Sequence, residues 1–346
     1  MKAQLQNENV VELPAGFTAR GATLDDVEEA MKLFNHWSNA VIGRDDFNGP
    51  ESIRHEWETP GVDPAQDIRL VFAPNGDLAG YIEVWTNAVP PARPELWARV
   101  DPDYQGMGIA TWLMQWAEGR ALEALPRVPD ELRFVTRVGV YRQDEKARKL
   151  FENTGYQHTR SWYHMLIEMD TPVIDPQFPA GITVRTYNSG TDLEAVYQAH
   201  TDAFRDHFGF VEKPLEEGLR EFKRHWEHDS IDPTLLFIAM DGSSGKIAGF
   251  NLCRPTSYYD SERGWVSALG VLRPWRKHGI GLALLRHAFN EFYRRGKRKV
   301  GLGVEAQNLT GALRLYESAG MHVDQAYDTY EKEMRPGREI SVKSLS

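Results

Sequence analysis

Two short glycine-containing segments have residue types and spacings that could do chemistry. They read Gln105-Gly-Met-Gly-Ile-Ala110 and Arg276-Lys-His-Gly-Ile-Gly281. Each follows an apolar run and precedes an amphipathic pattern with helical spacing. Successive amides of such a loop point at one place where a helix opens, and the helix dipole adds positive potential there. The second loop therefore predicts a pyrophosphate site, to which Arg276 and Lys277 would add charge.

The two loops lack the signatures of the common nucleotide sites. Neither ends in the Lys-Ser/Thr of a P-loop, and neither has the Gly-x-Gly-x-x-Gly fingerprint of dinucleotide sites. For either loop alone, a tight turn without a ligand is an alternative. Because both loops occupy the same place in the same order of elements, a shared binding role is favoured.

The chain repeats around these loops. Phe17-Thr-Ala-Arg20 recurs as Ile182-Thr-Val-Arg185, and Gly155 recurs as Gly320, at a constant separation of 165 residues. A repeat of this kind predicts a duplicated domain.

A proline-rich segment separates the two copies. Asp170–Gly181 contains three prolines, which lack the amide donors that a regular element needs. We therefore predict a linker there, with a boundary near residue 175 and domains at residues 1–175 and 176–346.

The elements around the second loop must hold it in place. Apolar runs at 235–240 and 247–252 flank a Gly/Ser-rich turn and predict a hairpin. A third run at 265–271 leads into the loop and its helix, and a strand at 300–304 and a helix over 308–320 follow. The first half repeats this order. Each half is therefore predicted to be an α/β (α+β) domain, with a mixed, largely antiparallel twisted sheet flanked by helices.

Composition restricts the class of protein. The 346 residues include 50 acidic and 40 basic side chains, and the net charge of −10 argues against broad nucleic-acid binding. No apolar run is long enough to cross a membrane and the amino terminus is polar, so a cytoplasmic protein with no membrane partner is expected. The single cysteine, Cys253, excludes an intrachain disulfide, and the histidines lack metal-ligand spacing, so we expect no metal site.

Both loops match the acetyl-CoA loop, Gln/Arg-x-x-Gly-x-Gly/Ala, of the GCN5-related N-acetyltransferase (GNAT) superfamily, which the sequence resembles. Asn308, Ala312, Leu315-Tyr316-Glu317 and Gly320 are similar to the closing pattern of that family. The resemblance covers nearly the whole chain as two tandem domains. Among tandem members, the chain is similar to the mycothiol synthase group, through Gly303-Val-Glu-Ala-Gln-Asn308 in particular.

The resemblance implies acetyl-CoA as the co-substrate. It implies that strand amides before the loop stabilise the oxyanion, that loop amides hold the pyrophosphate, and that Asn308 contacts the cofactor. The residues so implied in the second half are Leu269, Gly270, Val271, Arg276, Lys277, His278, Gly279, Ile280, Gly281, Leu282 and Asn308. Those in the first half are Gln105, Gly106, Gly108 and Ala110.

Tyr316 matches the tyrosine with which the family protonates the departing thiolate. A phenol with a pKa near ~10 suits a thiolate of comparable basicity, whereas a core aromatic is the alternative reading. The first half has Phe151 at this position and Gln143 at that of Asn308. Because phenylalanine donates no proton, we expect the second half to carry catalysis and the first half to be degenerate, either retaining an acetyl-CoA-like pocket or serving only as a scaffold.

The general base is less clearly indicated. Mycothiol synthase-like sequences have a glutamate on the strand before the loop, where this chain has Trp265. Glu305, just past the following strand, could accept the ammonium proton through a water, and His207 could do so because imidazoles titrate near neutrality. A surface carboxylate and a packed or capping histidine are the respective alternatives.

These residues together predict an N-acetyltransferase that acts on a primary amine of a small molecule by direct attack in a ternary complex. One alternative is mycothiol synthase itself, with a cysteinyl-glucosaminyl-inositol acceptor. The other is a non-catalytic acyl-CoA-binding protein. Both a monomer and a homodimer are compatible with the sequence.

Overall fold

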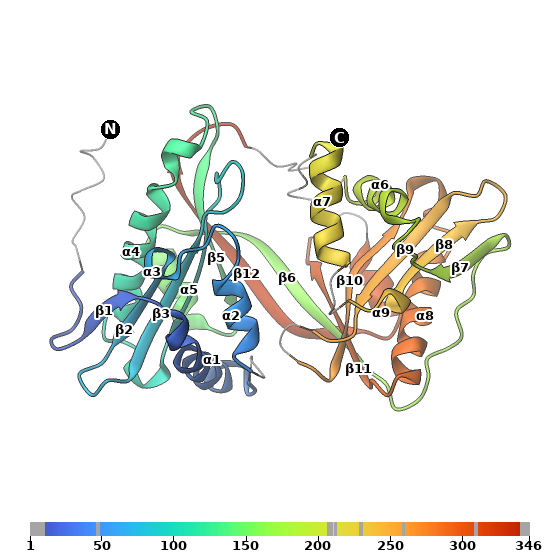
Figure 1. Cartoon of the computed structure of the whole chain (residues 1–346). Helices are drawn as coiled ribbons and strands as arrows, with labels where there is room; N and C mark the ends of the chain where they lie inside the picture. Colours follow the sequence, from blue (N-terminus) through green and yellow to red (C-terminus); the bar gives the residue numbers. More distant parts are fainter. Residues whose placement is uncertain are drawn as a thin grey trace. The chain divides into compact units, whose positions relative to one another are not determined.

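The protein is described as a computed structural model (Figure 1), in which its residues form two compact units. Described residues up to Arg160, together with Tyr327–Glu339, form unit 1, and Ser161–Ala326 form unit 2. The structure describes residues 11–45, 49–205, 210, 213–227, 231–257, 260–307 and 311–339.

Unit 1 is a mixed sheet with helices on both faces. Its strands, in spatial order, are β1 (Thr18–Gly21), β2 (Ile68–Phe72), β3 (Leu78–Trp85), β4 (Glu95–Val100), β5 (Phe134–Tyr141) and the second part of β12 (His322–Arg335). Its helices are α1 (Val27–Ile42), α2 (Glu51–Trp57), α3 (Pro64–Asp67), α4 (Ile109–Leu122) and α5 (Glu145–Asn153). Only β4 and β5 run parallel among the neighbouring strands of this unit.

Unit 2 repeats this plan. Its strands, in spatial order, are β7 (Ile182–Thr186), β8 (Leu236–Asp241), β9 (Ile247–Arg254), β10 (Arg263–Val271), β11 (Lys299–Glu305) and the second part of β6 (Gln157–Glu168). Its helices are α6 (Leu193–Phe204), α7 (Leu215–Trp226), α8 (Ile280–Arg294) and α9 (Ala312–Ser318). The predicted hairpin is present as β8 and β9, and only β10 and β11 are parallel. The predicted fold class is therefore confirmed in both units.

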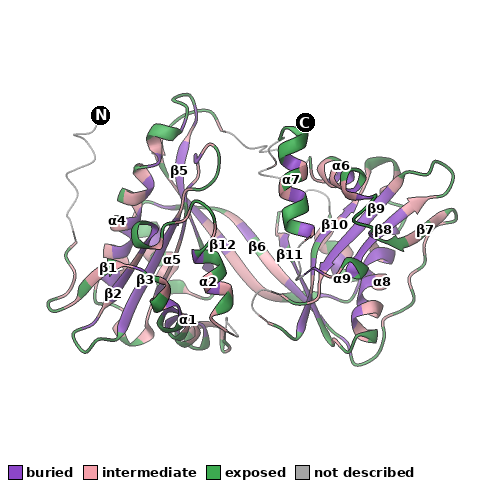
Figure 2. Ribbon diagram, in the orientation of Figure 1, coloured by how far each residue is buried: buried purple, intermediate pink, exposed green. Residues whose placement is uncertain are grey.

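Two hydrophobic cores enclose the sheet of unit 2. One core joins α8 and α9 to one face through residues such as Leu284, Phe289 and Tyr316. The other joins α6 and α7 to the opposite face through residues such as Ala203 and Phe250. Figure 2 shows the resulting burial along the strands. The two faces of this sheet are thus covered by separate helix layers.

The last strand of each unit comes from the other half of the sequence. Residues 162–168 of β6 pair with β11 in unit 2, and residues 327–335 of β12 pair with β5 in unit 1. The segment 170–181, predicted as a linker, forms neither helix nor strand. The boundary near residue 175 remains our proposal for the two sequence repeats, whereas the compact units each include a strand from the other repeat.

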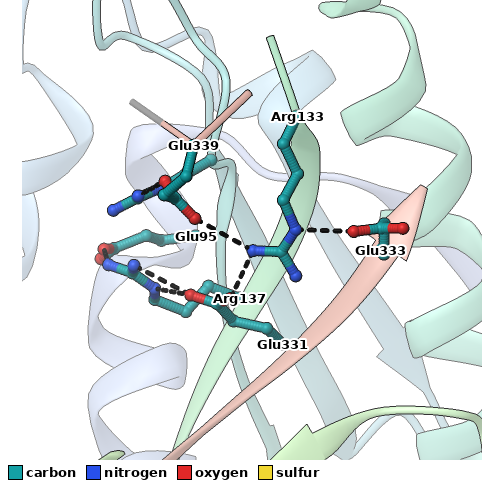
Figure 3. A network of polar contacts seen from close by, with 7 residues as sticks. Glu95, Arg133, Arg137, Glu331, Glu333 and Glu339 are labelled. Atoms are coloured by element: carbon teal, nitrogen blue, oxygen red, sulfur yellow. Dashed lines mark hydrogen bonds and ion pairs between the residues drawn. The ribbon is translucent and has the colours of Figure 1, made fainter. Parts of the chain in front are cut away.

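Ion pairs fix β12 in unit 1 (Figure 3). The carboxylate of Glu331, only 9% exposed, accepts from Arg133 Nη1 and Arg137 Nη2, each at 3.1 Å. Arg133 also donates through Nε to Glu333 at 2.7 Å. Burial opposes ionisation of Glu331, but the hydrogen bonds and charges of the two arginines outweigh it and lower the pKa of Glu331. The exchanged strand is thus held by charge as well as by its backbone ladder.

The helix predicted over 308–320 is shorter than expected. In the described residues it begins at Ala312, after Gly311 at a left-handed φ of +74°, and Asn308 lies outside the described residues. Its end is as predicted, because Gly320 follows the helix at a φ of +95°. None of the helices in the described ranges is long and apolar enough to cross a membrane.

Candidate active site

Strands β10 and β11 diverge in unit 2. Their parallel pairing extends from Arg263 opposite Lys299 to Val266 opposite Leu302, and no further within these two fully described strands. A β-bulge between Val266 and Ala268 bends β10 at this point, while β10 continues to pair with β9 as far as Val271. The end of β10 therefore borders a gap between two strands of one sheet.

The backbone of β10 presents amides to this gap. The amide of Leu272 donates to Ala248 O on β9 at 3.0 Å. Because N–H groups alternate along a strand, the amide of Gly270 also faces β9, and those of Leu269 and Val271 face the gap. Of the three residues implied for the oxyanion, these two have amides on the side where charge could be stabilised.

Gly270 has a different function, which is close packing. A Cβ atom built here would lie 2.3 Å from Phe250 Cζ and 2.9 Å from Ala203 Cβ. Glycine at this position therefore lets α6 approach the sheet next to the gap. Any larger side chain would push α6 or Phe250 away.

The second loop forms the predicted helix opening. Gly279 has a φ of +82° and caps α8, whose first turn closes with a bond from the Ala283 amide to Gly279 O at 3.0 Å. The amides of the three residues before Ala283 precede the helical ladder and point out of the helix end. With the helix dipole, these amides of Ile280, Gly281 and Leu282 lie where an anion could bind, at the residues that the sequence predicts.

Lys277 and His278 are exposed beside this helix end. Lys277 has a φ of +66° and is the one non-glycine residue of the described chain with a positive φ. A left-handed conformation costs a residue with a side chain about 1–2 kcal/mol. The matching residue of unit 1 is Gly106, at +80°. A lysine kept in a strained position at a helix opening is consistent with a functional need for its charge.

Arg276 braces the loop. Its Nε donates to Val271 O at 2.9 Å, and its Nη2 donates to Ala203 O at 3.3 Å. The guanidinium thus ties the loop to the end of β10 and to the end of α6. Gly281 adds a close approach, because a Cβ there would lie 3.1 Å from Leu315 Cδ2 on α9.

Tyr316 projects from α9 into the core under the loop. It is 9% exposed and lies in the same hydrophobic cluster as Ile280 of α8 and Val304 of β11. Burial raises the pKa of Tyr316 to about 12. Its hydroxyl has no hydrogen-bond partner within the part of the chain that the structure describes. The phenol is therefore protonated at neutral pH and has a proton to donate.

The two predicted bases differ in what the structure describes. Glu305 is the half-buried last residue of β11, rather than lying past the strand as expected, and it follows the last β10–β11 pair by three residues. Val300, Leu302 and Val304 face the α8 core, so Glu305 faces the opposite side of the sheet. His207 lies outside the described residues, as does Asn308.

Unit 1 has the same divergence of strands. Its β4 and β5 pair only at Glu95 with Arg137 and at Leu96 with Val138, within their described lengths. Gly106 and Gly108 have φ values of +80° and +87°, and α4 begins at Ile109. The first loop therefore has the predicted helix opening, next to Ala110.

In unit 1 an arginine side chain lies at the end of the strand that corresponds to β10. Arg99, whose counterpart is Gly270, donates to Ala98 O at 2.9 Å, and its guanidinium lies 3.8 Å from the ring of Trp37 and 4.0 Å from that of Trp97. The Asp101 amide donates to Ala79 O on β3 at 3.0 Å, so by alternation the carbonyl of Ala98 faces the gap. Arg99 therefore donates to a strand carbonyl on the gap side, that of Ala98, whose counterpart in unit 2 is Leu269.

Further contacts change the first loop. The side-chain carbonyl of Gln105 accepts from Lys146 Nζ at 2.8 Å. The Val11 amide donates to Gln115 Oε1 on α4 at 3.0 Å, and Val11 Cγ1 would lie 4.0 Å from a Cβ at Gly108. Phe151, buried at the position of Tyr316, packs 5.8 Å from the ring of Tyr330. Unit 1 thus keeps the diverging strands and the glycine-capped helix, but has a phenylalanine in place of the tyrosine.

Two residues near the gaps were not indicated by the sequence. In the sequence, Arg99 is one charged residue of a strand with alternating polarity. Its position next to the gap is evident only when β4 is aligned with β10. His164 lies on β6, opposite Gly303 of β11. Only a signal that β6 joins the second unit could have shown this, and the repeat pattern gives none.

Comparison with known proteins agrees with this geometry. The model of the Acetyltransferase (GNAT) family matches residues 34–156 and 193–321. A mycothiol acetyltransferase of Thermobispora bispora is 31% identical over 180 residues, which cover 50% of this chain and 58% of that relative. One of Saccharopolyspora erythraea is 28% identical over 273 residues, covering 77% of this chain and 86% of the relative. The crystal structure of a GCN5-related N-acetyltransferase from Sphaerobacter thermophilus has a TM-score of 0.83 at 34% identity, and covers 95% of this chain and 99% of that one.

Proposed function

Because the chain belongs to the Acetyltransferase (GNAT) family, and is thus an acyltransferase that uses acetyl-CoA, we propose that it acetylates a primary amine of a small molecule. We assign the reaction to unit 2. The observation that carries this assignment is the divergence of β10 and β11 beside an open helix end and a buried tyrosine.

The loop residues of unit 2 fit the polyanionic end of acetyl-CoA. The amides of Lys277 to Leu282 would hold the pyrophosphate, Lys277 adds charge, and Arg276 keeps the loop against β10. His278 and Gly279 supply amides to the same loop. Asn308, outside the described residues, completes the set that the family resemblance implies.

Acyl transfer from a thioester requires a stabilised oxyanion and a protonated leaving group. The amides of Leu269 and Val271 would donate to the thioester oxygen as it gains charge. Tyr316 would give its phenolic proton to the thiolate as the C–S bond breaks. Its raised pKa keeps that proton in place until the thiolate forms. The amine attacks directly, so no acyl group is carried by the protein.

We propose that unit 1 does not catalyse. Phe151 has no proton to give, and Arg99 stands where unit 2 has Gly270. The first loop and its helix also make contacts within the protein: the Val11 amide donates to Gln115 of α4, and Lys146 donates to Gln105.

A second candidate is the acetylation of cysteinyl-glucosaminyl-inositol. The relatives in Thermobispora bispora and Saccharopolyspora erythraea are named mycothiol acetyltransferases, which favours this acceptor. Trp265, where that group has a glutamate, weighs against it. A non-catalytic acyl-CoA-binding protein is the third candidate.

One experiment separates these candidates. The full chain is incubated with acetyl-CoA and a panel of small primary amines that includes cysteinyl-glucosaminyl-inositol, and products are resolved by mass. We expect one or more amines to gain an acetyl group with equal release of free thiol. Acetylation of cysteinyl-glucosaminyl-inositol alone would establish the second candidate. Binding of acetyl-CoA with no product from any amine would overturn the enzymatic assignment.

A further inference from the structure

One face of the unit 2 sheet has polar and aromatic side chains around two bare glycines. Val300, Leu302 and Val304 lie in the α8 core, so Gly301, Gly303 and Glu305 face the other way. On β6, Met165 and Ile167 lie in the same core, so His164 faces the same way as Gly303. These residues of neighbouring strands therefore share one surface.

Trp265 of β10 completes this surface. A Cβ at Gly301 would lie 2.7 Å from Trp265 Cζ3, so the indole covers the place where a side chain would be. The rings of Trp265 and His164 lie 5.3 Å apart, edge to face. A Cβ at Gly303 would contact both, at 3.9 Å from His164 Cδ2 and 4.0 Å from Trp265 Cζ2. Gly303, which has no side chain, thus forms the floor of a surface bordered by the imidazole of His164 and the indole of Trp265.

This floor borders the gap described above. Gly303 is the residue of β11 directly after the last pair with β10, which joins Val266 and Leu302. The gap-facing amides of Leu269 and Val271 belong to the part of β10 that follows this last pair. A molecule on Gly303 would therefore be next to the place assigned to the thioester, on the face opposite Tyr316.

We propose that His164 is the general base of the reaction and that Gly303, Trp265 and Glu305 form the seat of the acceptor amine. This assignment rests on the proposed function. It replaces Glu305 as the direct proton acceptor and leaves its carboxylate to attract the ammonium group.

The proton balance is simple. His164 takes one proton from R–NH₃⁺, and the free amine forms the C–N bond with the thioester carbon. The C–S bond breaks and the thiolate takes the proton of Tyr316. The nitrogen then loses its second proton, which restores the phenol, and His164 returns its proton to water. The products are the amide, free thiol and one proton.

Charged groups near His164 suit a cationic acceptor. Glu305 on β11 shares its face. The side chain of Arg263 on β10 passes over Gly301, and a Cβ at Gly301 would lie 3.1 Å from Arg263 Cδ. Its Nη1 donates to Asp324 of β12 at 3.0 Å. The cationic charge of Arg263 is therefore compensated, also by Asp260 at 3.6 Å, and does not repel an ammonium group.

The proposal has a structural consequence for the repeat. His164 belongs to the first half of the sequence, yet its strand joins the sheet of unit 2, the unit that contains Tyr316. The catalytic site of unit 2 is therefore incomplete without β6.

His164→Gln tests the proposal, with His158→Gln as the matched control. His158 is on the same strand but in unit 1, 3.6 Å from Asp328. With an amine found in the panel, we expect His164→Gln to lower kcat/KM about 100-fold at pH 7, the usual scale for a general base. The Kd for acetyl-CoA should stay within about twofold, since the base does not contact the cofactor loop. His158→Gln should match the wild type in both quantities.

The pH profile distinguishes a base from a packing residue. An imidazole base gives kcat/KM an acidic limb between about pH 5 and 8. That limb should be present in the wild type and absent in His164→Gln. Retention of the limb and of activity by the variant would overturn the assignment and leave the proposed function intact.

Other results are also decisive. If His164→Gln fails to fold, His164→Asn is measured in its place, and a wild-type profile without the acidic limb overturns the assignment by itself. If the wild type acetylates no amine, the proposed function falls and the assignment of His164 falls with it.

Discussion

Tyr316 and Phe151 are the pair of residues on which the difference between the two units depends. They occupy matching helices, and both are buried. The Tyr316 hydroxyl has no partner among the described residues, so it adds little to the stability of unit 2. A tyrosine hydroxyl that makes no hydrogen bond within the described residues is available for a chemical role.

Tyr316→Phe should therefore lower kcat about 100-fold while the unfolding temperature and the Kd for acetyl-CoA change little. Burial raises the pKa of Tyr316 to about 12, so the wild type should show no loss of its acid group up to about pH 10. Steady-state thiol release from pH 6 to 10 measures both. Phe151→Tyr is the matched control and should leave kcat unchanged. Equal kcat in Tyr316→Phe and the wild type would show that another group protonates the thiolate.

Single residues differ in how far the sequence predicts them. The turn glycines were predictable, because Gly279, Gly108 and Gly320 have the positive φ values that only glycine adopts without strain. The hydrogen bonds of Arg276 to Val271 O and Ala203 O were not predictable. A charged residue in such a loop suggests contact with a ligand, and only the tertiary structure brings these two carbonyls next to Arg276. His164 and Arg99 were missed for the same reason, since their neighbours lie on strands distant in sequence.

At the scale of elements, the strands that form the gap were predicted and the exchanged strands were not. The runs before each loop and the β8–β9 hairpin have clear apolar patterns and turn residues. Strand β12 carries Glu331 and Glu333, which pair with Arg137 of β5 and with Arg133 just before it, and sequence periodicity does not indicate these pairs. In the described residues, α9 begins only after Gly311, whose φ of +74° is outside the helical range.

The Glu331 pairs should set the stability of the exchanged strand. Glu331→Gln leaves Arg133 and Arg137 without their shared buried carboxylate, and should lower the free energy of unfolding by about 3 kcal/mol. Urea denaturation at pH 7 measures this. Glu333→Gln is the control, because Glu333 is 46% exposed and, among the described residues, forms an ion pair with Arg133 only; the substitution should cost less than about 1 kcal/mol.

The same variant has a defined pH dependence. The pKa of Glu331 is lowered in the folded protein, so its stabilising effect is present above the ordinary carboxyl pKa and is lost as the pH falls through the folded value. The difference between the wild type and Glu331→Gln should therefore shrink below about pH 4. Equal stability of the two proteins at pH 7 would show that the network does not hold β12.

For the whole molecule, a repeated fold does not mean a repeated function. Both units have diverging strands and a glycine-capped helix. Within the described residues, only unit 2 combines them with a tyrosine on the second helix and with a glycine, Gly270, where unit 1 has Arg99. The net charge of −10 is compatible with an anionic cofactor, because helix amides and Lys277 create a local positive field.

The stoichiometry of acetyl-CoA binding tests this central claim most directly. Isothermal titration of the full chain should give one site. Lys277→Gly, which removes a charge but suits the left-handed φ of +66°, should weaken that site about tenfold. Lys146→Gln, which changes the first loop through Gln105, should leave it unchanged. Two sites for the wild type, or one site that responds to Lys146→Gln and not to Lys277→Gly, would contradict the account.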